Sequence, residues 1–159
     1  MKKKSSLWKF RLRDALIYKT GIDPRFDQSQ YDTVFFADYR GKLWLSIGID
    51  GTITVEPGYA WDGCSPKWQI GWLQFGTPDG APNPKTGYPY TYYASCLHDA
   101  LLQWADEAKM PYTREQIDLI FYEKLRLDAF PAADLYYNAV SLYTRLIGLW
   151  RNFPLRMGL

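Results

Sequence analysis

The sequence is poor in histidine and cysteine: its 159 residues include one histidine, His98, and two cysteines, Cys64 and Cys96. These are too few for a disulfide-rich scaffold or for a tetrahedral zinc site. In a reducing compartment we expect both thiols to be free. Imidazole is the side chain that ordinarily titrates nearest neutral pH, so imidazole-based acid–base chemistry in this chain must use His98.

Long apolar runs are also absent. No stretch of about 18 consecutive apolar residues occurs, so we expect no transmembrane segment. After Lys2-Lys3-Lys4 the apolar residues are interrupted by charges, which is unlike a secretion signal. The net charge of +2 is too small to indicate a nucleic-acid partner. These absences predict a soluble, cytoplasmic protein.

Aromatic residues, in contrast, are abundant at 18% of the chain. Aromatic side chains bury large areas and keep a polar edge. Their excess fits an aromatic-rich core, and it also fits a broad surface for protein, carbohydrate or lipid.

The first half of the chain predicts β structure. Segments rich in β-branched and aromatic residues predict strands at 32–37, 42–49 and 52–55, with 15–18 as a candidate fourth. Asp50-Gly51 predicts a two-residue type I′ hairpin. We expect an antiparallel meander of three or four strands.

The second half predicts helices at about 92–106, 113–127 and 131–150. Thr113 and Gln116 form a capping-box pattern, and Pro131 suits the first turn of the third helix. The prediction is one α+β domain: a β-rich half at about 10–75, a Gly/Pro-rich loop at 76–90 and a bundle of about three helices at 91–151.

Two titratable side chains lie at the margins of apolar helix faces. His98 borders the apolar stripe of the first predicted helix, and Asp118 borders that of the second. If these helices are antiparallel neighbours, Asp118 can hydrogen-bond His98, as an aspartate orients a catalytic histidine. A pair of this kind is commonly just a satisfied polar contact that holds two helices together.

Three motifs in this order resemble a family of small phage- and prophage-encoded proteins of unknown function. They are the loop Asp62-Gly63-Cys64-Ser65-Pro66, the helix motif Leu97-His98-Asp99 and the helix motif Asp118-Leu119-Ile120-Phe121. The resemblance covers roughly residues 50 to 150. It implies a phage origin, in the host cytoplasm or the virion, and no settled activity.

The chain departs from that family at a few positions. In the segment before the loop, Glu56 stands where the family has proline, and the pattern is offset by one residue. Cys64 stands where a small residue is usual, and Ile117 replaces an alanine. Pro66 directly follows Ser65. Each polar member of the pattern is retained.

The site is also similar to that of phospholipase A2 enzymes, which carry His-Asp on one helix and an aspartate on its antiparallel partner. The similarity implies that His98 is the base, that Asp118 orients it and that Asp99 binds Ca²⁺. Residues 61–64 would be the calcium loop, with Cys64 and Cys96 near one another and Asp62 as a further ligand. The flanking cysteines and glycines of those enzymes are absent, so the similarity is confined to the site. A different hydrolase would use Ser65 or Cys64 as nucleophile.

Two functions therefore stand open. The first is a hydrolase with a His98/Asp118 dyad, acting on an ester or related bond with or without Ca²⁺. The second is a non-enzymatic virion component or host-interaction protein, with other phage proteins or a host factor as partner, in which the same residues join the helices to the sheet.

Overall fold

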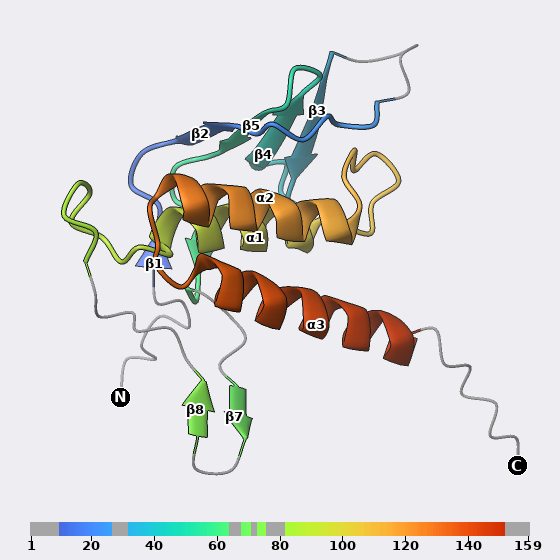
Figure 1. The fold of residues 1–159 in the computed structure, drawn as a ribbon. Coiled ribbons are helices and arrows are strands. Elements are labelled where there is room, and N and C mark those ends of the chain that lie inside the picture. The colour runs from blue at the N-terminus through green and yellow to red at the C-terminus, as the bar shows by residue number, and fades with distance from the viewer. Residues whose placement is uncertain (1–9, 27–31, 64–67, 71–72, 76–81, 152–159) are drawn as a thin grey trace, which may run out of the picture.

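The computed structural model describes residues 10–26, 32–63, 68–70, 73–75 and 82–151. The predicted α+β class is confirmed, because antiparallel strands precede three helices (Figure 1). The strands are β1 Phe10–Arg11, β2 Leu16–Lys19, β3 Thr33–Ala37, β4 Leu43–Gly48, β5 Thr52–Val55, β6 Ala60–Trp61, β7 Trp68–Ile70 and β8 Leu73–Phe75. The helices are α1 Tyr92–Gln103, α2 Arg114–Leu127 and α3 Ala133–Arg151.

The main sheet has four antiparallel strands in the order β2-β5-β4-β3. The predicted meander is β3-β4-β5, and the candidate fourth strand adds to it as β2 beside β5. Alternate residues of each strand are buried, as a sheet with one covered face requires. The buried set includes Tyr18, Val34, Phe36, Leu45, Ile47, Ile53 and Val55.

The hairpin predicted at Asp50-Gly51 is in the expected place but is not type I′. The backbone N–H of Gly51 donates to the carbonyl of Gly48 at 3.0 Å, and Gly51 has a φ of 80°. Asp50 does not share that left-handed conformation, which a type I′ turn requires at both central positions. Its carboxylate instead accepts hydrogen bonds from the backbone N–H and the hydroxyl of Thr52, at 3.0 and 2.8 Å. The connection is thus a three-residue loop that ends in a left-handed glycine.

A two-stranded sheet of β1 and β6 joins the strands to the helices. It ends at Trp61, whose buried indole Nε1–H donates to the Ser95 hydroxyl on α1 at 3.1 Å. This bond fixes where the chain leaves the sheet, and it therefore places Asp62 next to α1.

The helices form a layer on one face of the main sheet (Figure 1). α1 and α2 pack side by side, and α3 packs on α2. α1 ends at Gln103, three residues before the predicted end, and the ring of Trp104 then packs 5.8 Å from that of Phe36. No helix within the described ranges is both long and apolar enough to cross a membrane.

The capping box at the start of α2 is confirmed. The backbone N–H of Gln116 donates to the Thr113 hydroxyl at 3.2 Å, and the Gln116 side-chain oxygen accepts from the backbone N–H of Thr113 at 2.9 Å. Two N–H groups that the first helical turn cannot satisfy thus have partners.

We predict that Thr113→Ala lowers the free energy of unfolding by about 1 kcal/mol, because it removes the acceptor for the Gln116 N–H. Chemical denaturation followed by circular dichroism measures this. Gln116→Ala, which removes the reciprocal bond, should also destabilise the protein. Unchanged midpoints in both variants would show that the box does not stabilise α2.

Candidate functional site

Helix α1 is enclosed on most of its surface, so its polar side chains need internal partners. Its buried residues are Tyr92, Ala94, Ser95, Cys96, Leu97, His98, Ala100 and Leu101. Among them, the Ser95 side chain is almost fully buried. Its hydroxyl accepts from Trp61 and donates to the carbonyl of Tyr92 at 3.1 Å.

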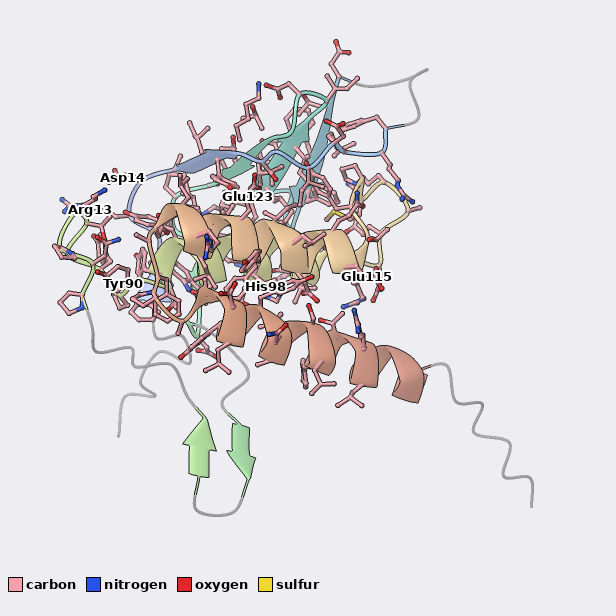
Figure 2. All side chains as sticks on the ribbon, in the orientation of Figure 1. Arg13, Asp14, Tyr90, His98, Glu115 and Glu123 are labelled. Carbon is pink, nitrogen blue, oxygen red and sulfur yellow. The ribbon has the colours of Figure 1, made fainter. Side chains whose placement is uncertain are left out.

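The predicted pair of His98 and Asp118 forms across α1 and α2. His98 Nε2 lies 2.8 Å from Asp118 Oδ1, and the two side chains are 6% and 2% exposed. The ring of Phe121 packs against the imidazole with centroids 5.0 Å apart. Figure 2 shows His98 inside the helical layer, whereas Glu123 lies on the side of the sheet, where it accepts from the backbone N–H of Gly21. The imidazole is thus held by one carboxylate and one aromatic ring of α2.

This contact selects the tautomer of the imidazole. A carboxylate accepts hydrogen bonds, so neutral His98 carries its proton on Nε2 and donates it to Asp118. The other nitrogen, Nδ1, then has a free lone pair that can take a proton. A buried carboxylate is also expensive without a donor, so each partner satisfies the other.

Asp99 leaves α1 on a different side from His98 and is half-buried. The pKa of its carboxyl group is raised to about 6, chiefly because burial penalises the charged form. His98 acts in the opposite direction, and the negative charge of Asp62 raises the Asp99 pKa. The pKa of Asp99 therefore lies about one pH unit below neutrality.

Tyr59 and Asp62, on either side of β6, both interact electrostatically with Asp99. Asp62 is exposed and follows β6, and Gly63, which is buried, adopts a left-handed φ of 87°. The Tyr59 hydroxyl donates to the side-chain oxygen of Gln103 at 3.0 Å, one turn beyond Asp99 on α1. Burial and the charge of Asp99 raise the pKa of Tyr59, so this phenol stays protonated and acts as a donor.

The predicted site residues thus form two pairs that share α1. His98 and Asp118 meet between the helices, whereas Asp99 and Asp62 interact electrostatically where α1 meets the loop after β6. Ser65 and Cys64 lie outside the described residues, so their roles stay predictions. Cys96 is a buried free thiol, and burial raises its pKa, which makes it a poor nucleophile.

The chemistry of the Asp62–Asp99 pair fits a hard cation in part. Carboxylate oxygens are the ligands that Ca²⁺ prefers, and a cation between them would remove their repulsion. However, Ca²⁺ takes six to eight oxygen ligands. Among the described residues, no three His, Cys, Asp or Glu side chains come together as a metal site. Further ligands would have to be other oxygen groups, such as backbone carbonyls or water.

A second polar cluster, at the end of α2, was not predicted. The Lys124 ammonium pairs with Asp128 and lies 5.9 and 5.6 Å from the ring centres of Tyr18 and Tyr93. Burial and the charge of Glu123 raise the pKa of Tyr18. The sequence offered one signal, the i, i+4 spacing of Lys124 and Asp128. That spacing is usual on exposed helices and does not by itself indicate burial.

We predict that Asp99→Asn stabilises the protein at neutral pH. Because the folded pKa of about 6 exceeds the unfolded value of about 3.9, the favourable contribution of Asp99 is complete below pH 3.9. It is lost as pH rises through 6. The stability advantage of the asparagine variant should therefore grow between pH 4 and pH 7, which urea unfolding at several pH values measures.

Asp50→Asn is the matched control with the opposite sign. Hydrogen bonds from Thr52 lower the pKa of Asp50, so its carboxylate stabilises the fold above its unfolded pKa. This variant should lose stability relative to the wild type as pH rises. If Asp99→Asn behaved in the same way as Asp50→Asn, the raised pKa of Asp99 would be wrong.

Comparisons of the chain with protein-family models, with curated proteins and with solved structures found no match.

Proposed function

We propose that the chain is a phage-encoded hydrolase that cleaves an ester or related bond, with His98 as general base and Asp118 as the residue that orients it. The observation that carries this proposal is the raised pKa of the Asp99 carboxyl group. A structural His–Asp pair needs no second acid beside it. Burial and the charge of Asp62 raise the pKa of the half-buried Asp99 carboxyl group, so its ionised form destabilises the fold at neutral pH. Perturbed acids of this kind concentrate at functional sites.

In the proposed reaction Nδ1 of His98 takes a proton from a water molecule while the water oxygen attacks the ester carbonyl carbon. The bond from that carbon to the leaving alcohol oxygen then breaks, and the imidazolium returns the proton to this oxygen. Asp118 stabilises the imidazolium through the Nε2–H hydrogen bond.

Asp99 and Asp62 are the residues that would hold Ca²⁺. A bound Ca²⁺ would polarise the ester carbonyl and stabilise the charge that develops on its oxygen. Ser65 as nucleophile remains the alternative form of the same proposal, in which His98 would deprotonate the hydroxyl in place of water.

We predict that His98→Gln lowers the rate of p-nitrophenyl butyrate hydrolysis at least about 100-fold, because it removes the general base. Asp118→Asn should also be strongly impaired, since an amide cannot stabilise the imidazolium as a carboxylate does. The assay compares these variants with Glu115→Gln. Glu115 is an exposed residue of α2, the helix that carries Asp118, and this variant should retain the wild-type rate. Circular dichroism confirms that each variant is folded.

We further predict that Ca²⁺ at millimolar concentration raises the melting temperature of the wild type and not that of Asp99→Asn. A ligand that binds only the folded state must stabilise that state. Differential scanning fluorimetry with Ca²⁺ and with Mg²⁺ measures the shift. Equal shifts in the wild type and the variant would show that Asp99 is not a calcium ligand. Only the form of the reaction that needs no metal would then remain as the proposal.

One observation favours the second function, a non-enzymatic phage protein that binds virion or host proteins. The His98 side chain is only 6% exposed, and Asp118 satisfies its Nε2 within the helical layer. If the pair is only structural, His98→Gln should match the wild type in the ester assay. Each single substitution should then lower the free energy of unfolding by about 3–5 kcal/mol, while the double apolar variant His98→Leu/Asp118→Leu should recover most of that loss.

A further inference from the structure

Helix α3 has two apolar sides, and within the described part of the chain only one of them packs against another element. Ala133 and Val140 are buried, and they belong to a cluster with Phe121 and Leu125 of α2. Figure 1 shows α3 as the outermost helix, with α1 and α2 on one side of it. The packing on α2 therefore accounts for one side of α3.

The opposite side of α3 presents a stripe of Leu135, Ala139, Leu142 and Leu146. Spacings of four, three and four residues bring these side chains onto one helix face. The three leucines are 64%, 59% and 40% exposed. Scattered exposed leucines are ordinary, but leucines aligned along one helix form a contiguous apolar surface of the kind that marks an interaction site.

The order of the stripe makes it complementary to itself. Leucines stand at both ends, and a small Ala139 and a large Leu142 occupy the middle. When a second α3 is laid antiparallel on the first, Leu135 meets Leu146 of the other copy at each end. In the centre, Ala139 meets Leu142 of the other copy, so a large side chain packs over a small one. A parallel arrangement would instead place Leu142 against Leu142.

The charges beside the stripe favour the same arrangement. Asp134 and Arg145 each directly precede an end leucine of the stripe, so both lie on the same flank. In a two-fold symmetric antiparallel pair, the same flank of both helices lies on the same side of the contact. The N-terminal end of each helix lies beside the C-terminal end of the other. Asp134 of one copy therefore lies about two residues, or roughly 3 Å along the axis, from Arg145 of the other. A hydrogen bond from the Tyr122 hydroxyl holds the Asp134 carboxylate in position.

We propose that two copies of this chain associate through an antiparallel, two-fold symmetric contact between their α3 helices. The stripe forms the centre of the contact, and Asp134 and Arg145 form two ion pairs across its flank. A contact of one helix per copy buries less than the roughly 800 Å² per partner of a stable complex. The dimer therefore dissociates on dilution. This inference is independent of the proposed hydrolytic function.

Sedimentation velocity over a concentration series tests the dimer. The wild type should shift from monomer to dimer as its concentration rises from micromolar to millimolar. Leu142→Glu places a charge at the centre of the stripe and should keep the protein monomeric throughout. Leu127→Glu, at a 68% exposed leucine of α2 outside the stripe, is the matched control and should dimerise like the wild type.

Charge reversal tests the antiparallel geometry. Arg145→Glu and Asp134→Arg should each weaken self-association, because each sets like charges against one another. An equimolar mixture of the two variants restores both ion pairs and should dimerise at least tenfold more tightly than either variant alone. Thermal unfolding of Asp134→Arg checks that loss of the Tyr122 hydrogen bond leaves the monomer folded.

Three results would overturn the proposal. The first is a wild type that stays monomeric at millimolar concentration. The second is a dimer that Leu142→Glu leaves intact, or that Leu127→Glu disrupts equally. The third is co-sedimentation of the wild type with phosphatidylcholine–phosphatidylglycerol vesicles, lost in Leu142→Glu, without self-association. That result would assign the stripe to a lipid surface.

Discussion

The burial of α1 is the constraint on which the rest of the site depends. This helix lies among the strands, α2 and the loop after β6, so most of its side chains have no access to water. A polar group in such a place is stable only with a hydrogen-bond partner. Ser95 is satisfied by Trp61 and His98 by Asp118, and these two contacts fix the loop and α2 relative to α1. Asp99 is the exception, because burial and the negative charge of Asp62 both raise the pKa of its carboxyl group.

Features set by local sequence were predictable. The capping box of Thr113 and Gln116 depends on residues three apart, and the strand alternation depends on a period of two. The pairing of His98 with Asp118 was predictable for a related reason. Helical periodicity gave each residue's place on its face, and a short connection implied antiparallel neighbours. Only the contact between the two faces had to be assumed.

Features that depend on which partner a side chain finds were not predictable. The burial of Ser95 depends on Trp61, which is placed by the pairing of β1 with β6. The type of the Asp50 hairpin depended on whether its carboxylate would bind Thr52, which a dipeptide pattern does not reveal. The buried pair of Lys124 and Asp128 was missed because its spacing is also that of ordinary surface pairs. In each case the partner, rather than the residue itself, decided the outcome.

The strand order also has a consequence for how the chain folds as it is made. β1 and β2 pair with β6 and β5, so Leu16 finds its partner Val55 only after the whole meander between them has been synthesised. At about 5–20 residues per second, the ribosome takes roughly two to eight seconds to add that intervening stretch. During this interval β1 and β2 lack their partner strands, so Phe10 and Leu16 cannot yet be buried against them. Synthesis of β5 and β6, rather than the formation of any helix, supplies those partners.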